Sequence, residues 1–178
     1  VLNDAPATTV HDVTMTPSST SVNGAGSWNV TFGVSAALVA GTGTITIQFP
    51  AGVVLPETID KSRVSAGAGT LLYPLTSDPT ITTSTRTVIL TVPATKPGGG
   101  DVTGITVNDV VTVFFSQLAG IVNPAASGAA GGSVAANQGD VSTSAQTTAA
   151  TIASVTATTF VKTISINVTT QVEGGAVE

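Results

Sequence analysis

The chain has 178 residues, of which 8% are charged and 42% are hydrophobic, and it carries a net charge of −5 and no cysteine. These figures exclude disulfides and thiol-based metal or catalytic sites. The absence of a basic patch argues against nucleic-acid binding. No stretch approaches the ~18 consecutive apolar residues of a membrane-spanning helix, so we expect no membrane span.

The low content of charged residues is the most informative property of the composition. Soluble proteins usually contain about 25% charged residues, and a monomer with far fewer tends to self-associate. Three explanations are open. The surface is buried in a polymer, it is covered by glycan, or the protein works in a medium where charge is a poor solubiliser, such as acid.

The N-terminal residues 1–11 are irregular, and strand alternation begins after them. The sequence starts with Val1, without a basic segment followed by an apolar one, so we interpret it as a secreted chain whose signal peptide has been removed. Residues 12–16 alternate Val13 and Met15 with polar residues, which predicts a first strand that Pro17 ends.

Two alternating segments form the centre of the predicted fold. Residues 28–34 place Trp28, Val30, Phe32 and Val34 on one face, and residues 43–49 do the same with Ile45, Ile47 and Phe49. Period-two alternation predicts strands with one buried face. Because the only Trp and two of the five Phe residues lie here, we expect this pair to anchor the core.

The middle of the chain predicts three further strands. A short one is expected within residues 59–64, and the apolar run 71–75 is a strand or a buried loop. Residues 86–92 place Val88, Leu90 and Val92 on one face. A long glycine-rich turn is predicted over residues 93–101.

The last third of the chain begins with a strand over residues 109–117. This strand is apolar on both faces, which predicts a central position in a sheet with both faces covered. Residues 133–144 predict one or two weak strands, and residues 148–158 are rich in Ala and Thr. Residues 160–172 alternate again.

These patterns predict an all-β chain: an immunoglobulin-like β-sandwich of about nine or ten strands with a terminal strand extension. No window has helical spacing with caps. We expect an N-terminal extension over residues 1–11, a sandwich domain over residues 12–157 and a C-terminal strand extension over residues 158–178, either extension being a candidate donor strand.

Several segments resemble the immunoglobulin-like β-sandwich modules of prokaryotic surface proteins. They comprise residues 13–20, 28–32, 43–52, 108–115, 119–124 and 140–144. The resemblance extends roughly over residues 12–157 and implies a role in surface layers, stalks or filaments, with no catalytic residues. The chain also resembles subunits of pilus-like or thread-like filaments that assemble by strand donation.

The terminal strand has two interpretations: it completes its own sandwich, or it completes the sheet of a neighbouring subunit by β-augmentation. The donor candidates at the C-terminal end are Phe160, Ile164, Ile166 and Val168. The N-terminal segment 1–10, with Leu2 and Val10, is the rival donor.

Two Asn residues, Asn29 and Asn167, begin glycosylation sequons and lie on the polar faces of their predicted strands. In a Thr-rich chain such sequons also arise by chance, and modification requires a competent host. Covalent glycan is therefore a candidate partner.

Metal binding and catalysis are not expected. Asp101, Asn108 and Asp109 lie near one another, but their spacing is not that of an EF-hand, and Asp residues in turns usually cap the turn itself. His11 is the single histidine and belongs to no triad pattern. We predict no metal, no cofactor and no enzymatic activity.

The function predicted from the sequence is a structural subunit of an extracellular filament or pilus-like homopolymer assembled by strand donation. The alternative is a non-polymerising adhesin or surface-layer module that binds carbohydrate or protein through its loops. An accessory domain of a secreted hydrolase is a third class.

Overall fold

The computed structural model describes residues 10–126, 131–137 and 148–151, which form ten β-strands, two 3-10 helices and no α-helix. The strands are β1 (Val10–Pro17), β2 (Trp28–Val34), β3 (Thr44–Gln48), β4 (Val64–Ala68), β5 (Tyr73–Pro74), β6 (Thr80–Thr82), β7 (Thr87–Thr91), β8 (Val110–Phe115), β9 (Gly131–Asn137) and β10 (Thr148–Thr151). The 3-10 helices are η1 (Lys61–Arg63) and η2 (Gln117–Ala119). The prediction of an all-β chain is confirmed.

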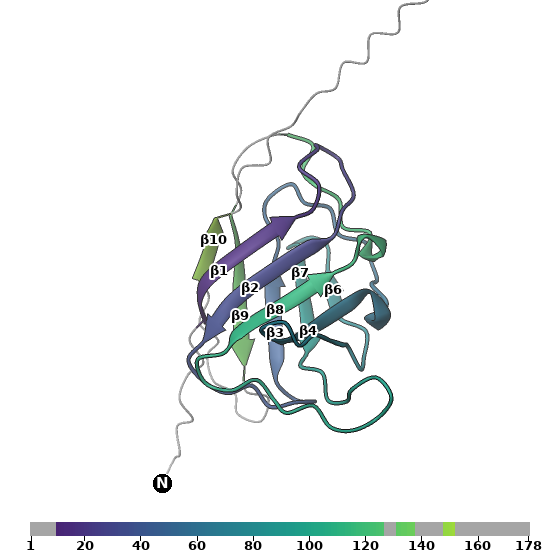
Figure 1. Cartoon of the computed structure of the whole chain (residues 1–178). Helices are drawn as coiled ribbons and strands as arrows, with labels where there is room; N and C mark the ends of the chain where they lie inside the picture. Colours follow the sequence, from purple (N-terminus) through teal and green to yellow (C-terminus); the bar gives the residue numbers. More distant parts are fainter. Residues whose placement is uncertain (1–9, 127–130, 138–147, 152–178) are drawn as a thin grey trace, which may run out of the picture.

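The strands form two five-stranded antiparallel sheets that pack face to face (Figure 1). The first sheet has the order β1-β2-β8-β4-β5 and the second has the order β10-β9-β3-β7-β6. Hairpin pairs such as β1–β2 and β6–β7 alternate with connections that cross between the sheets. This arrangement is the immunoglobulin-like sandwich that the sequence predicts.

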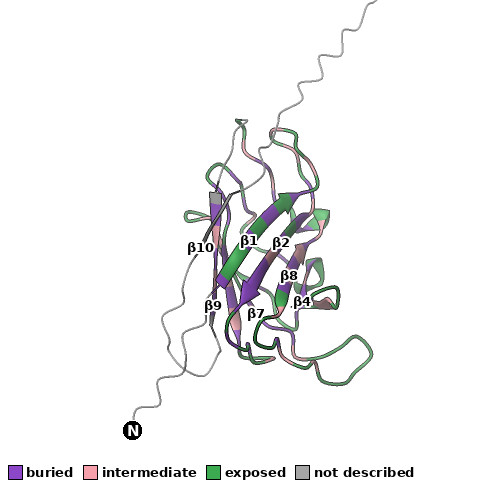
Figure 2. Ribbon diagram, turned by 60° about the vertical axis from the view of Figure 1, so that its left-hand side comes forward, coloured by how far each residue is buried: buried purple, intermediate pink, exposed green. Residues whose placement is uncertain are grey.

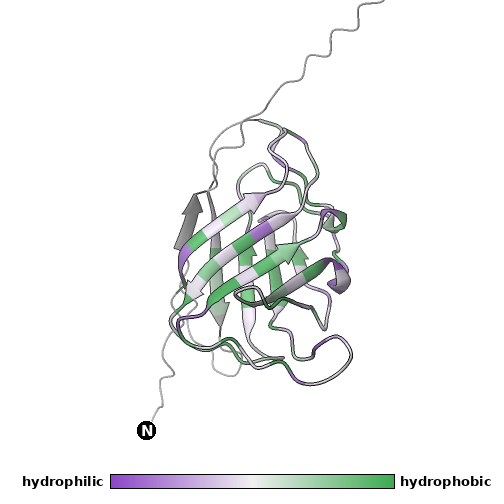
Figure 3. Cartoon of the chain, in the orientation of Figure 1, coloured by the Kyte–Doolittle hydropathy of each residue, from purple (hydrophilic) through white to green (hydrophobic). Residues whose placement is uncertain are grey.

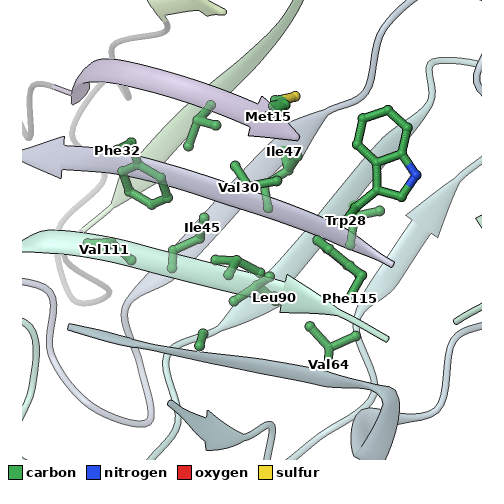
Figure 4. Close-up of a cluster of buried hydrophobic side chains, with 14 of the residues drawn as sticks. Met15, Trp28, Val30, Phe32, Ile45, Ile47, Val64, Leu90, Val111 and Phe115 are labelled. Carbon is green, nitrogen blue, oxygen red and sulfur yellow. The ribbon is translucent and has the colours of Figure 1, made fainter. Parts of the chain in front are cut away.

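The core lies between the sheets and is built from the alternating residues of the central strands (Figure 4). Trp28 is fully buried and meets the ring of Phe49 edge to face, with centroids 5.3 Å apart. Phe49 meets Phe115 in the same way at 5.4 Å. Such aromatic pairs stabilise a core beyond their area of burial, and the predicted anchoring by residues 28–34 and 43–49 is confirmed.

The register defines two ends of the sandwich, which we name after residues of β2. At the Trp28 end, Trp28 pairs with Phe115 and with Pro17. At the Val34 end, Val34 pairs with Val10, the first residue of β1. β10 ends at the Trp28 end, because Thr151 pairs with the first residue of β9.

The prediction of a strand within residues 59–64 is wrong. Residues 61–63 form η1, because the Asp60 side chain accepts a hydrogen bond from the Ser62 N–H at 2.8 Å and caps the turn. The Lys61 N–H donates to Asp78 Oδ1 at 2.8 Å, which holds the turn against the following loop. The extended chain starts only at Val64, as β4.

The predicted central strand is placed correctly but is covered on one face only. β8 lies in the middle of the first sheet, and Val111, Val113 and Phe115 are buried. On the other face Val110 is 57% exposed and Phe114 is half-buried. The outer face of an antiparallel sheet can meet solvent, which explains the difference.

Other details of the chain agree with its local chemistry. The turn over residues 96–100 contains Gly98, Gly99 and Gly100, all with positive φ near 90–100°, a region open to glycine.

Asn123, a fully buried polar residue, donates from Nδ2 to the carbonyls of Ser19 and Ser21 at 2.6 and 3.0 Å. This contact fixes the loop before β2.

Candidate subunit interface

The strands of this sandwich carry almost no charge. Among the described strands, Asp12 in β1 is the single Asp, Glu, Lys or Arg. Figure 3 accordingly shows mostly pale and green colours on the strands. Many of the outward positions are filled by Thr and amide side chains: Thr14, Thr16, Asn29, Thr31, Thr44, Thr46, Gln48, Thr87 and Thr91. These faces therefore lack the charges that normally keep sheets apart.

One lateral side of the sandwich, which we call the closed side, is formed by β1 of the first sheet and β9 and β10 of the second. β1 packs closely against both strands, as Figures 1 and 2 show from two directions. Met15 is buried and reaches across to β9, where a Cβ on Gly132 would lie 2.6 Å from its Sδ. The sheets therefore meet in direct contact at this side.

The edge of β1 is also shaped against further pairing. Its register shifts between His11 and Thr14, and Asp12 has a φ of 52°. The His11 ring lies over Gly33, where a Cβ would clash with it, and its Nδ1 lies 2.8 Å from Asp12 Oδ2. Bulges and charges of this kind are common protections of an edge strand.

The opposite lateral side, the open side, is bounded by two very short edge strands. β5 has two residues and includes Pro74, and β6 has three and follows Pro79. In the described part of the chain, these two strands do not approach each other as β1 and β10 do. The sandwich is therefore less closed at this side than at the other.

A groove follows the open side between β4–β5 and the segment 92–106. Its deeper section has a volume of about 310 Å³. The residues that line it are mostly apolar and include Ala66, Ala68, Leu71, Tyr73, Val92 and Ile105. A shallower section of about 370 Å³ is lined by Lys61, Pro74, Leu75, Thr76, Thr95, Lys96 and Pro97. Lys96 belongs to both sections, and we call the two together the open-side groove.

Local backbone contacts set the shape of the groove. A Cβ on Gly67 would collide with the carbonyl oxygen of Leu71, so the turn after β4 can lie directly on the strand. This leaves Leu71 at the rim, 65% exposed. On the facing wall, Asp109 Oδ2 accepts hydrogen bonds from the N–H and the hydroxyl of Thr106 at 2.7 and 2.9 Å.

The structure places one of the donor-strand candidates. Val10 is buried in the first sheet of its own sandwich and pairs with Val34, so it could act as a donor only if that end of β1 left its sheet. Leu2, Phe160, Ile164, Ile166 and Val168 lie outside the described residues.

The two glycosylation candidates also differ. Asn29 is exposed on the outer face of β2, between its register partners Thr16 and Phe114. Its side chain is therefore directed to solvent, as the alternation predicts. Asn167 lies outside the described residues.

The described residues considered for metal binding do not form a metal-ligating group. Among the described residues, no group of three or more His, Cys, Asp or Glu side chains could hold a metal ion. Asp109 instead caps the turn that contains Thr106, as Asp residues in turns commonly do. No helix of the described chain is long and apolar enough to cross a membrane.

The groove is the feature that the sequence analysis did not identify. A signal for it exists in the apolar run Leu71-Leu72-Tyr73-Pro74-Leu75, which we interpreted as a strand or a buried loop. Leu75 is buried, but Leu71 is exposed. An apolar run that ends in a proline-containing, two-residue strand therefore marks an edge rather than a core strand.

No family model and no curated protein matches the chain. Among solved structures, it is similar to the full-length major pilin SpaD from Corynebacterium diphtheriae, at 12% identity and a TM-score of 0.41, over 83% of this chain and 34% of that one. Domains D2 and D3 of the same pilin give 12% identity and a TM-score of 0.39, over 83% of this chain and 50% of theirs. The chain thus spans about a third and a half of those two structures.

Proposed function

We propose that the protein is a structural subunit of an extracellular homopolymer in which a terminal segment of one subunit completes the sandwich of the next. The observation that carries this proposal is the position of the alternating run 160–172. It follows two sheets whose continuous core is already formed by described residues between Val10 and Ala136. We propose that the apolar side chains of that run are buried in a second copy.

Burial of the run in a second copy would gain hydrophobic free energy. A large apolar side chain contributes about 1.5–3 kcal/mol when it is fully buried, so Phe160, Ile164, Ile166 and Val168 together could contribute on the order of 5–10 kcal/mol before ordering costs. Before those costs, this range corresponds to dissociation constants from about 0.2 mM to about 50 nM.

The surface of the sandwich supports the same proposal. Its described strands carry a single charged residue, Asp12, so sheet faces of neighbouring copies can approach without a large cost of charge desolvation. A polymer that buries these faces would explain how a chain with 8% charged residues stays in solution.

Deletion of residues 159–178 tests the proposal. The deleted chain should keep its β-sheet circular dichroism spectrum and sediment as a monomer, while the full chain forms detergent-resistant assemblies. A synthetic peptide of residues 159–172 should bind the deleted chain. Unchanged assembly after the deletion would refute donation from this end, and a parallel deletion of residues 1–9 tests the rival donor.

The open-side groove also supports a second function, that of a binding module at the cell surface. Its deeper section of about 310 Å³ is at the small end of the range for ligand pockets, and it offers the ring of Tyr73 beside apolar side chains. For this function, Tyr73→Ala should abolish binding to a glycan array while the wild-type chain remains a monodisperse monomer.

We also propose Asn29 as a glycan acceptor, because its side chain is exposed and its sequon is intact. Mass spectrometry of native material should show a glycan mass on the peptide that contains Asn29. An unmodified peptide at full occupancy would exclude this site.

A further inference from the structure

We propose that Asn23 is a latent site of spontaneous deamidation, and that hydrogen bonds to residues 123–124 keep the reaction slow in the folded protein. Asn23 is exposed in the loop between β1 and β2, and Gly24 follows it. This is the single Asn-Gly pair of the sequence. The reaction at this loop does not depend on strand donation, so it goes beyond the proposed function.

The Asn-Gly pair supplies both reacting groups. The backbone nitrogen of Gly24 loses its proton to base and attacks the side-chain Cγ of Asn23. The new C–N bond closes a succinimide ring, the C–N bond of the side-chain amide breaks, and the amide group takes up a proton and leaves as ammonia. Water then opens the ring to Asp or isoaspartate. Glycine permits the attack because it has no Cβ to crowd the nitrogen and its backbone is free to rotate.

The fold explains why this reactive pair is present. Asn23 has a φ of 53°, in the left-handed region where Asn is enriched among residues other than glycine. A Cβ on Gly24 would lie 2.8 Å from the Oγ of Ser19 and 2.9 Å from the carbonyl oxygen of Ser21. The turn therefore favours Asn followed by Gly in spite of their reactivity.

Backbone hydrogen bonds hold the pair on both sides. The Asn23 N–H donates to the Pro124 carbonyl at 3.1 Å, and the Asn123 N–H donates to the Gly24 carbonyl at 2.9 Å. The attacking nitrogen is engaged as well, since the Gly24 N–H donates to the Ser21 carbonyl at 3.1 Å. Ring closure requires loss of the Gly24 proton and rotation of the backbone between Asn23 and Gly24, so these contacts oppose both steps.

The side chain of Asn123 supports this arrangement from inside the protein. It is fully buried, and its Nδ2 donates to the carbonyls of Ser19 and Ser21, which precede Asn23 in the same loop. Asn123 itself cannot react in this way, because Pro124 follows it and has no N–H to lose. We therefore assign Asn123 as a positioning residue that restrains the loop.

Peptide mapping by mass spectrometry tests the proposal. The full chain and a synthetic peptide of residues 18–28 are incubated at mildly alkaline pH, and Asp and isoaspartate at position 23 are measured over time. Because the folded chain reacts only after local opening of the loop, we expect it to react about tenfold more slowly than the peptide, or slower still. The chain unfolded in urea should react like the peptide.

Asn108 is the internal control within the same chain. It is exposed and has a φ of 66°, but Asp109 follows it in place of a glycine. It should therefore remain largely unmodified in the folded and the unfolded chain. Equal rates for Asn23 in the folded chain and in the peptide would overturn the protection, and an unreactive peptide would overturn the site.

Asn123→Ala tests the positioning role, because it removes the contacts of the side chain and keeps the Asn-Gly pair. It should speed the modification of Asn23 several-fold and raise hydrogen exchange at the Gly24 amide, with an unchanged circular dichroism spectrum. Asn29→Ala on the outer face of β2 is the matched control and should change neither.

If Asn123→Ala does not fold, the wild-type chain in urea below its unfolding transition provides the same test. The rate of modification at Asn23 should rise with urea concentration as the loop opens locally. A rate that responds neither to urea below the transition nor to a folded Asn123→Ala variant would overturn the role of residues 123–124.

Discussion

The two lateral sides of the sandwich differ in how far their edge strands cover the core. At the closed side, Met15 of β1 packs across to Gly132 of β9, so the sheets cover each other's core residues. At the open side, β5 and β6 are too short to do so, and a mostly apolar groove remains. The difference teaches that the core can be continuous while one flank still offers apolar surface to a partner.

The largest expected effect is on the free energy of unfolding. It distinguishes a buried side chain on the closed side from an exposed one on the open side. Met15→Ala should lower the free energy of unfolding by about 2–5 kcal/mol, because it removes a buried side chain and leaves a cavity. Leu71→Ala should change it by less than about 0.5 kcal/mol, as expected for an exposed position. Urea denaturation of both variants under monomeric conditions measures the difference, and similar losses would contradict the distinction between the sides.

Two glycine substitutions sharpen the comparison. Gly132→Ala on the closed side and Gly67→Ala on the open side should each cost about 1–3 kcal/mol of stability, because the new Cβ would meet Met15 or the carbonyl of Leu71. Urea denaturation of each variant measures the loss. An unchanged free energy of unfolding for either variant would show that its neighbours shift at no cost to accommodate the methyl group.

The smallest expected effect concerns the cap beside the shallow section of the groove. Hydrogen bonds from the side chain and backbone N–H of Ser62 lower the pKa of Asp60, with smaller contributions from Arg63 and Lys61. A lowered pKa in the folded state contributes stability above the unfolded pKa, and this contribution is lost as pH falls through the folded value. Because Asp60 is fully exposed, the change in stability should be slight and confined to acidic pH.

Ser62→Ala should raise the pKa of Asp60 toward its ordinary value, because the hydroxyl provides the largest contribution to the shift. A pH titration of the Asp60 carboxyl carbon by NMR measures this, with Thr58→Ala as a control outside the cap. An unchanged titration would show that the hydroxyl does not stabilise the carboxylate.

The strands were predictable where alternation between apolar and polar residues decides the buried face. Residues 28–34 match β2, and Val88, Leu90 and Val92 are buried as predicted. The 3-10 turn at Lys61 was missed because it depends on hydrogen bonds to Asp60 and Asp78, one of which joins residues far apart in the sequence. β6 was missed because three residues are too few to show a period.

The groove was less accessible to sequence reasoning than the strands. It depends on the lengths of β5 and β6 and on the path of residues 92–106, neither of which a local pattern fixes. The predicted donor residues, by contrast, are read from alternation alone, and those at 160–168 stay a prediction.

Electron cryo-microscopy of native assemblies tests most directly whether one copy completes the next. We predict continuous density for residues 159–172 that leaves one subunit and joins a sheet of the following subunit. Density in which both termini fold back onto their own sandwich, or particles that remain single subunits, would contradict the account.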